Sequence, residues 1–320
     1  MSTPTDVHDL AKRLIAGLDQ VIIGQGEPKE ALVACLLAGG HALIEGVPGT
    51  GKTLLALALS RLAGCGFRRI QFTPDLMPID LLGTNILDQR KGEFTFMPGP
   101  VFSEVLLADE INRTPPRTQS ALLEAMQERA VTIDGVRRAL PRPFFVFATQ
   151  NPVEFEGTYP LPEAQRDRFL IRVAIGYPAP DDEIGVLRAY AEGRPLHEAV
   201  LEGLTPITDP AGIVAAQLAI STGVRVEDRL LRYIRELVAA TRTDQSVQLG
   251  AGPRAGLAIL AIGRSLAALR GRDFLIPDDI KAAVPMVLSH RLVLAAESEM
   301  EGGTVGETIS RILAAVEIPR

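Results

Sequence analysis

The sequence predicts an α/β nucleotide-binding domain at residues 1–176, a linker at 177–183 and a helical domain at 184–320. Three observations support this division. A short apolar segment runs directly into a loop of the form G-x-x-x-x-G-K-T, and a helix-forming run follows that loop. Two further apolar segments end in polar residues of the kinds that hydrolytic sites use. Beyond a proline-rich stretch, hydrophobic residues recur at helical spacing.

The glycine-rich loop at 46–53 is the first candidate site. Its glycines can adopt backbone angles closed to other residues, so successive N–H groups can surround an anion, and the next helix adds the partial positive charge of its N-terminus. In this pattern Lys52 reaches the β- and γ-phosphates, and the Thr53 hydroxyl coordinates Mg²⁺. A chance match would need every fixed position and both flanking elements to coincide. The predicted phosphate-binding residues are Gly46, Val47, Pro48, Gly49, Thr50, Gly51, Lys52, Thr53 and Leu54.

Two later strand ends supply candidate catalytic residues. The apolar run before Asp109 and Glu110 reads as a buried strand. Because neighbouring side chains of a strand point to opposite sides, Asp109 can reach hydrated Mg²⁺ while Glu110 faces the water that attacks the γ-phosphate. Asn151 ends another apolar strand, and its neutral amide can hold the γ-phosphate or the water without competing for the proton.

Composition narrows the class of protein. The 320 residues are 47% hydrophobic and carry a formal net charge of −6, which argues against a protein whose main activity is coating nucleic acid. The sequence shows neither the ~18–20 apolar residues of a membrane span nor the order of a secretion signal, so we expect a cytoplasmic protein. Cys35 and Cys65 are expected to be buried small hydrophobes, and His41 to be a structural or surface histidine rather than a ligand.

Other segments predict local structure. Prolines and a glycine in 73–100 exclude one long helix and predict an insertion with short strands, either a packed loop or a mobile element that touches a substrate or a neighbouring subunit. Thr114 is expected to cap the helix that follows it. Residues 130–140 predict a hairpin turning at Asp134-Gly135. A lid hinged at the linker could swing as the nucleotide changes.

The order of these motifs resembles the MoxR family of the AAA+ ATPase superfamily. The similarity spans nearly the whole chain and rests on residues 46–53, 106–113, 121–129, 147–152, 156–170 and 252–255. It implies a five-stranded parallel sheet with flanking helices, an all-helical C-terminal lid, and a ring that is commonly a hexamer. It also implies Mg²⁺-dependent ATP hydrolysis that remodels or matures a protein partner, such as one with a von Willebrand factor A fold.

The resemblance also assigns roles to individual residues. Asn151 matches sensor 1, Arg168 the arginine finger that enters the neighbouring subunit's site, and Arg254 sensor 2 of the lid. The segment 73–100 matches the insertion in helix 2, and 131–140 the hairpin before sensor 1. The residues that would line the adenine are Ile22, Ile23, Gly24 and Gln25.

Two positions depart from the family pattern. Arg166 stands where the family usually has an apolar residue, so two arginines flank Asp167 and either could be the finger. Gly252 stands where serine is frequent, and glycine is also an acceptable helix N-cap.

Two other functions remain open. A nucleic-acid motor or loader would use the same insertion and hairpin, and Arg137 and Arg138 near the hairpin tip are its support. A scaffold that binds ATP without turnover is the other alternative, which the presence of Glu110 disfavours.

Overall fold

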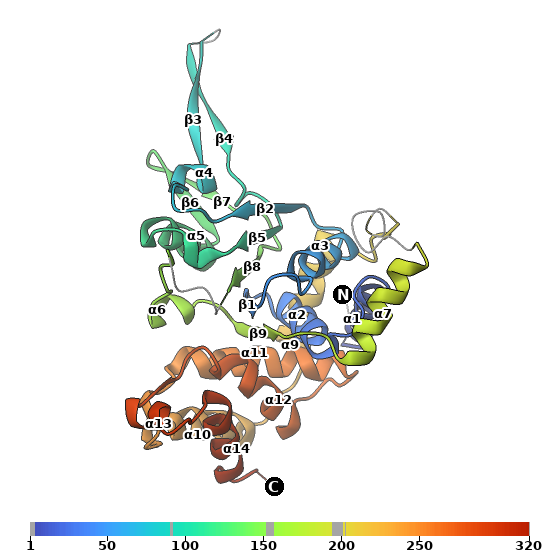
Figure 1. The fold of residues 1–320 in the computed structure, drawn as a ribbon, viewed down its shortest axis with the longest axis vertical. Coiled ribbons are helices and arrows are strands. Elements are labelled where there is room, and N and C mark those ends of the chain that lie inside the picture. The colour runs from blue at the N-terminus through green and yellow to red at the C-terminus, as the bar shows by residue number, and fades with distance from the viewer. Residues whose placement is uncertain (1–3, 90–91, 152–156, 194–200, 202, 320) are drawn as a thin grey trace.

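The protein contains a five-stranded parallel sheet, as the family resemblance implied (Figure 1). The computed structural model describes residues 4–89, 92–151, 157–193, 201 and 203–319. In these residues the strand order is β2-β5-β8-β1-β9, and neighbouring strands are parallel. The strands are β1 (Ala42–Gly46), β2 (Phe67–Gln71), β5 (Val105–Asp109), β8 (Phe145–Gln150) and β9 (Ile171–Ile175). Because all five run in one direction, the residues that follow them gather at one edge of the sheet.

Helices cover both faces of the sheet. Ala42 and Ile44 of β1 join the hydrophobic cluster on one face, while Leu43 joins the cluster on the other. The first face is covered by α1 (Pro4–Asp19), α2 (Gly26–Ala38) and α3 (Lys52–Leu62), and the second by α4 (Pro78–Leu82) and α5 (Pro116–Glu128). The sheet is therefore the middle layer of three.

A domain rich in helices follows the sheet, although it is not all-helical as expected. Two short strands, β10 (Val247–Leu249) and β11 (Val293–Leu294), pair antiparallel within it, and segments this short leave little alternation in the sequence. The helices of this part of the chain are α7 (Pro180–Ala191), α9 (Pro210–Gly223), α10 (Asp228–Thr243), α11 (Pro253–Leu269), α12 (Pro277–Leu288), α13 (Ala296–Met300) and α14 (Val305–Ala315). In the described part of the chain, none of the helices has the length and apolar character needed to cross a membrane.

Helix α7 begins at Pro180, inside the range predicted as a linker. A proline in the first turn and three acidic side chains at 181–183 all favour a helix N-terminus. The same residue types are common in linkers, so composition alone does not separate the two. The division of the chain into domains at this point remains a prediction.

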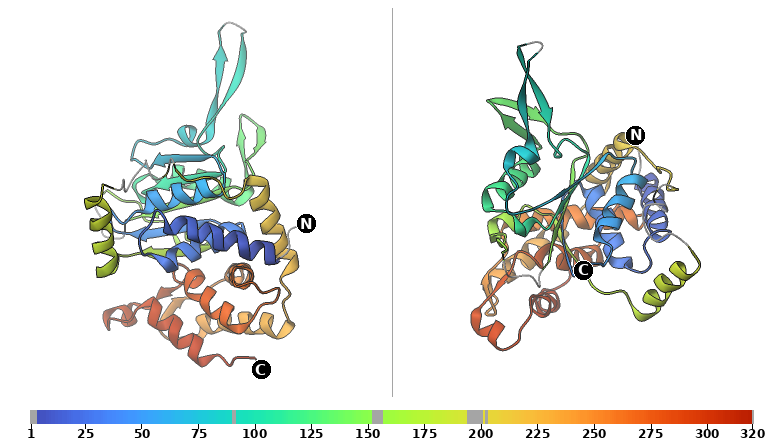
Figure 2. Two further views of the ribbon diagram at one scale, coloured as in Figure 1. Left: turned by 90° about the vertical axis from the view of Figure 1, so that its right-hand side faces the viewer. Right: turned by 45° about the horizontal axis from the view of Figure 1, so that its top comes forward.

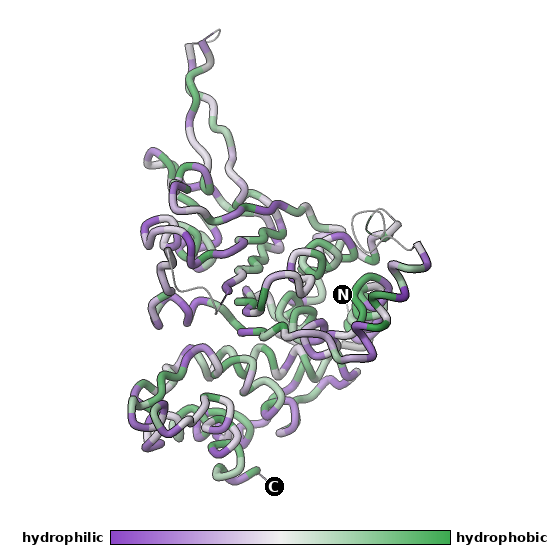
Figure 3. The backbone as a smooth tube through the Cα atoms, in the orientation of Figure 1, coloured by the Kyte–Doolittle hydropathy of each residue, from purple (hydrophilic) through white to green (hydrophobic). Residues whose placement is uncertain are grey.

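The helical domain packs directly against the nucleotide-binding domain. One hydrophobic cluster continues from Leu32 on α2 to Ile259 on α11, and the buried Ser265 hydroxyl donates to the carbonyl of Ala34 at 2.8 Å. Figure 2 shows the blue N-terminal helices next to the orange and red C-terminal helices, and Figure 3 shows hydrophobic residues along both groups. A swing of the helical domain would have to open this shared core.

Two antiparallel hairpins extend from the body at one end (Figures 1 and 2). The first, β3 (Gly83–Asp88) with β4 (Glu93–Pro98), confirms the short strands expected in 73–100. The second, β6 (Ala130–Ile133) with β7 (Val136–Ala139), turns at Asp134 and Gly135 with φ of 49° and 78°, which confirms the two-residue turn. The hairpins touch each other, because Asn85 donates to Asp134 at 2.6 Å.

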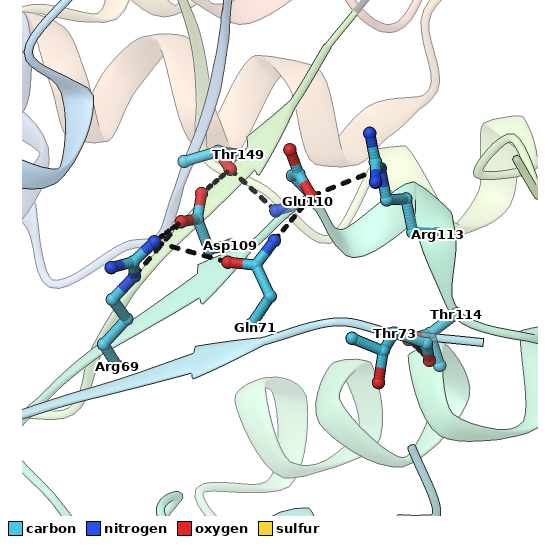
Figure 4. Close-up of polar contacts among 8 residues, drawn as sticks. All are labelled: Arg69, Gln71, Thr73, Asp109, Glu110, Arg113, Thr114 and Thr149. Carbon is cyan, nitrogen blue, oxygen red and sulfur yellow. Dashed lines mark hydrogen bonds and ion pairs between the residues drawn. The ribbon is translucent and has the colours of Figure 1, made fainter. Parts of the chain in front are cut away.

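The expected helix cap at Thr114 is wrong. Helix α5 begins at Pro116, and its N-cap residue is Pro115. The buried Thr114 hydroxyl donates instead to the carbonyl of Thr73 at 2.7 Å (Figure 4). This acceptor lies 41 residues earlier in the chain, so the local pattern could not reveal the competing bond.

The expectations for His41 and the cysteines are confirmed. His41 is buried, accepts a hydrogen bond from the Val146 N–H at 3.1 Å and donates to the Met126 carbonyl at 3.3 Å. Burial lowers the pKa of His41 to about 4. Cys35 and Cys65 are both buried and free.

Candidate nucleotide site

The loop at 46–53 connects β1 to α3 and has the geometry of a phosphate cradle. Gly49 and Gly51 have φ of 83° and 82°, a conformation that glycine adopts without strain, and a Cβ at either position would meet no described atom within 4 Å. Gly46 is required for a different reason from the one expected. A Cβ there would lie 2.3 Å from the Ile175 carbonyl oxygen, so the close approach of β9 explains this glycine.

Lys52 lies across the base of this loop. Its ammonium group donates to the carbonyl oxygens of Gly46 at 2.6 Å and Val47 at 3.4 Å. The Thr50 hydroxyl donates to the same Val47 carbonyl at 3.0 Å. Lys52 and Thr53 open helix α3, so the positive charge, the hydroxyl and the positive end of the helix dipole all meet at the loop.

Asp109 and Glu110 are joined by a threonine that the motif does not include. The Thr149 hydroxyl donates to Oδ1 of Asp109 at 2.6 Å and accepts a hydrogen bond from the Glu110 N–H at 2.8 Å (Figure 4). The other Asp109 oxygen accepts two bonds from Arg69, at 2.6 and 3.1 Å. Thr149 therefore fixes the Asp109 carboxylate relative to the backbone of Glu110.

Glu110 does not continue strand β5. The expectation that strand alternation points the Asp109 and Glu110 side chains to opposite sides is therefore wrong. Strand β5 ends at Asp109, and Glu110 has φ 57° and ψ 51°, in the left-handed region. The short helix η1 (Ile111–Arg113) begins immediately afterwards. The backbone turn, not strand alternation, separates the Glu110 side chain from that of Asp109.

The carboxylate of Glu110 is held by two further side chains. Its Oε2 accepts a hydrogen bond from Gln71 at 2.5 Å and forms an ion pair with Arg113 at 3.2 Å (Figure 4). Arg69 and Gln71 lie on the same side of β2, two residues apart, and Gln71 pairs in register with Asp109. Sequence reasoning missed both because the adjacency of β2 and β5 is a tertiary fact. The available signal was the pair of polar side chains, Arg69 and Gln71, two residues apart at the end of β2.

Asn151 lies at the same edge as the phosphate loop. It is buried and directly follows β8, whose Gln150 pairs in register with Glu45 of β1. The ends of β1, β5 and β8 therefore bring the loop, Glu110 and Asn151 together, as the sequence predicted.

The predicted adenine-lining segment, Ile22 to Gln25, lies beside the end of β9. Gln25 donates to the Gly176 carbonyl at 3.1 Å, and the preceding residue, Ile175, pairs with Gly46. The buried Lys29 donates to the Ile22 carbonyl at 2.7 Å and fixes the start of this segment. The segment is thus next to the phosphate loop. The adenine ring of a nucleotide whose phosphates were held by that loop would have to lie close by.

Arg168 and Arg254 lie at the opposite edge of the sheet. They line one pocket of about 360 Å³ together with Gly39, Gly40 and His41, which precede β1. The phosphate loop begins where β1 ends, roughly 16 Å further along a five-residue strand. The structure therefore does not bring Arg254 to the phosphate loop of its own chain, where a nucleotide-binding residue was expected.

Both arginines are available at this edge. Arg254 is exposed and Arg168 is half-buried, and within the described residues neither side chain has a hydrogen-bond or ion-pair partner. Arg166, the other finger candidate, pairs with Glu163 at 3.4 Å on α6 (Glu163–Arg166). The two arginines that flank Asp167 therefore differ: the Arg166 side chain has an ion-pair partner on its own helix, whereas the Arg168 side chain has none among the described residues.

The edge of the sheet where β1, β5 and β8 end is the carboxyl edge, and its oxygen donors fit Mg²⁺ and a nucleotide. Thr53 and Asp109 would supply two oxygen ligands, and in the described residues no three His, Cys, Asp or Glu side chains form a metal-binding cluster. Mg²⁺ typically takes one or two protein oxygens and completes its shell with phosphate oxygens and water. An ion that needs both the protein and a nucleotide matches this arrangement.

Comparison with known proteins finds relatives of both domains. Residues 41–171 match the ATPase family associated with various cellular activities (AAA), and residues 239–312 match the AAA lid domain. The chain is 44% identical to "Uncharacterized protein YeaC" of Bacillus subtilis, covering 100% of this chain and 98% of the relative. It is 43% identical to "Chaperone MoxR1" of Mycobacterium tuberculosis, with 98% and 84% covered, and 32% identical to "Protein MoxR" of Paracoccus denitrificans, with 93% of both covered.

A solved structure has the same fold. A crystal structure from Cytophaga hutchinsonii, described as a candidate ATPase, has a TM-score of 0.89 at 38% identity and covers 98% of this chain and 96% of that one.

Proposed function

The chain belongs to the MoxR family of AAA+ ATPases, and we propose that it hydrolyses ATP with Mg²⁺ in a ring of identical subunits, commonly a hexamer. The observation that carries this proposal is the convergence of Lys52, Asp109, Glu110 and Asn151 at one edge of the sheet. Scaffolding without turnover would not require a carboxylate base at that edge.

The carboxyl edge performs the hydrolytic step in this proposal. The N–H groups of 46–53 and Lys52 hold the phosphates, Thr53 and Asp109 bind Mg²⁺, and Ile22 to Gln25 line the adenine. A Mg²⁺ ion held by these residues would supply positive charge to offset the charge that develops on the phosphates. Glu110 exchanges its bonds to Gln71 and Arg113 for the attacking water and accepts its proton, while the Asn151 amide orients the water.

The opposite edge of the sheet, where β1 and β9 begin and where Arg168 and Arg254 lie, is the amino edge. In this proposal it acts on the neighbouring subunit. Arg168 and Arg254 share a pocket far from their own phosphate loop, and Arg129 and Arg291 also line it, so four guanidinium groups against the single carboxylate of Asp167 concentrate positive charge there. Entry of this edge into the next subunit's site would stabilise the transferring phosphoryl group. An arginine supplied in this way contributes about 10³–10⁵ to the rate, so isolated subunits should hydrolyse ATP poorly.

We further propose that the ring acts in the cytoplasm as a chaperone on a protein partner with a von Willebrand factor A fold. The name of the relative "Chaperone MoxR1" supports action on proteins. The support for a nucleic-acid motor is weakened, because Arg137 pairs with Glu128 at 3.9 Å and Arg138 lies 3.9 Å over the ring of Phe96.

The test combines turnover with partner capture. Specific ATPase activity should rise with protein concentration, because each site needs its neighbour's arginines. Protein partners should be recovered with the Glu110→Gln form in ATP. Stimulation by DNA or RNA that disappears on changing Arg137 and Arg138 to alanine would instead favour the motor, and activity independent of concentration would contradict the shared site.

A further inference from the structure

Arg291 is a buried arginine of the helical domain that binds the segment carrying Arg168. It lies between α12 and β11, and its side chain is only 4% exposed. Its guanidinium donates to Oδ1 of Asp167 at 2.7 Å, and to the carbonyls of Phe169 at 2.6 Å and Leu170 at 3.2 Å. The same guanidinium also donates to the Asp167 carbonyl at 3.3 Å and to the Val287 carbonyl at 2.5 Å. The planar fork of arginine is the side chain that can serve so many acceptors at once.

His290 binds the same segment from the adjacent position. It is buried, and its Nε2–H donates to the Phe169 carbonyl at 3.1 Å. Burial and the nearby charge of Arg291 lower the pKa of His290 well below its usual range, so its ring is neutral and does not repel the guanidinium. Two consecutive side chains of the helical domain therefore hold one turn of the nucleotide-binding domain.

These bonds surround Arg168, whose own side chain has no bond to another described residue. The carbonyls on either side of it, at Asp167 and Phe169, are bound by Arg291, and the Phe169 ring is fully buried on the other face of the sheet. The Leu170 N–H donates to the His41 carbonyl at 2.8 Å. The backbone of Arg168 is thus immobilised in advance, which lowers the entropy cost of placing its side chain on a ligand.

Arg291 also connects the two arginines of the amino edge. It lines the same pocket as Arg168 and Arg254. Arg254 lies in the first turn of α11, and α11 packs closely on α12, the helix that leads to Arg291. Both arginines are therefore carried by the helical domain, one directly and one through the bonds of Arg291.

We propose that Arg291 is a positioning residue that holds Arg168 in a fixed place relative to Arg254, so that the two enter the neighbouring subunit's nucleotide site together. This inference rests on the proposed function, in which the amino edge completes the next subunit's site. In this inference, Arg291 of the helical domain positions Arg168, which belongs to the nucleotide-binding domain.

The first test is Arg291→Lys in the full chain. Lysine keeps the charge but offers its donors from a single point, so it cannot span the Asp167 carboxylate and four carbonyls. We expect kcat to fall at least about tenfold, since a displacement of about 1 Å can cost about 10²-fold. The KM for ATP, and binding of a fluorescent ATP analogue to the variant's own phosphate loop, should stay unchanged. Asp167→Asn, which removes the paired charge at constant size, should show the same split and serves if Arg291→Lys fails to fold.

The second test mixes two defective subunits. Arg291→Lys has an intact catalytic site and misplaced arginines, whereas Glu110→Gln has a defective base and well-placed arginines. In an equal mixture about a quarter of the interfaces combine the two intact halves, so activity should recover well above that of either form alone. Arg168→Ala mixed with Glu110→Gln calibrates the recovery, and Arg264→Lys, which alters a lid arginine bonded to the Ser221 carbonyl, should keep wild-type kcat.

The outcomes separate the inference from the proposed function. Recovery with Arg168→Ala but not with Arg291→Lys or Asp167→Asn overturns the positioning role. A wild-type kcat in both of the latter variants overturns it as well. If Arg168→Ala also fails to recover, or if the wild-type chain lacks Mg²⁺-dependent ATPase activity, the shared site itself is contradicted and the inference falls with it.

Discussion

The two edges of the central sheet hold their functional residues by different means. At the carboxyl edge, Asp109 and Glu110 are bonded to Arg69 and Gln71, side chains of the neighbouring strand (Figure 4). At the amino edge, Arg291 is buried and bonded chiefly to backbone carbonyls. Side-chain partners can be exchanged when a nucleotide and metal arrive, whereas a backbone clamp cannot move without local unfolding. In the proposed function, the chemistry is thus placed where contacts can change, and the arginines are presented from a rigid base.

The largest expected effect comes from the carboxyl edge. Glu110→Gln should lower ATP hydrolysis by about 10³-fold or more while leaving ATP binding intact, because only the base is lost. Lys52→Ala should abolish hydrolysis and also weaken binding. Steady-state kinetics with equilibrium binding of an ATP analogue would check both. Hydrolysis by Glu110→Gln at the wild-type rate would exclude the proposed base.

The next largest effect tests whether the amino edge acts between subunits. Arg254→Ala should lower kcat about 10²-fold or more, and activity should return when it is mixed with Glu110→Gln, because Arg254 lies beside Arg168. Mixed-subunit ATPase assays provide the measurement. An Arg254→Ala defect that no partner subunit restores would mean that Arg254 acts on its own phosphate loop, and the contrast between the edges would be lost.

Acid should weaken the amino edge selectively. The pKa of His41 is lowered from 6.5 to about 4 by burial, and that of His290 is also lowered. Because the unfolded chain binds more protons between these values, stability is present above about pH 6.5 and is lost as the pH falls. For His41 this loss should be about 2 kcal/mol between about pH 7 and about pH 5, and His290 should act in the same direction.

The measurement is denaturant unfolding at a series of pH values. The His41→Gln variant should show a smaller loss of unfolding free energy over this range than the wild-type chain. Equal slopes in the two proteins would show that His41 does not contribute to acid sensitivity.

The smallest expected effect concerns Arg69 and Mg²⁺. Arg69 bonds Oδ2 of Asp109, and its side chain is half exposed, so it competes with a metal at a cost of at most about 1 kcal/mol. Arg69→Gln should therefore lower the Mg²⁺ concentration for half-maximal ATPase activity by up to about fivefold. Gln71 is unchanged in this variant, so the bond from β2 to Glu110 stays in place and only the bond to Asp109 is altered. A higher Mg²⁺ requirement would show that Arg69 assists the metal site.

Much of the carboxyl edge could be predicted from the sequence. The phosphate loop, Asp109-Glu110 and Asn151 each follow an apolar run, and their spacing carries their chemistry. Even there the local pattern misled at Glu110 and Gly46. The left-handed turn at Glu110 and the approach of β9 to Gly46 depend on neighbours that are not adjacent in the chain.

The sequence by itself determined the nucleotide chemistry, because a phosphate loop and its strand ends are local features whose residues are contiguous. Tertiary structure alone decided which side chains surround those residues and where the arginines lie. The order of β2 and β5 brought Arg69 and Gln71 to the carboxylates, and the packing of α11 and α12 on the sheet brought Arg254 and Arg291 to Arg168. Arg291 lies 124 residues after Asp167, and only the burial of shared hydrophobic surface brings two such distant segments together.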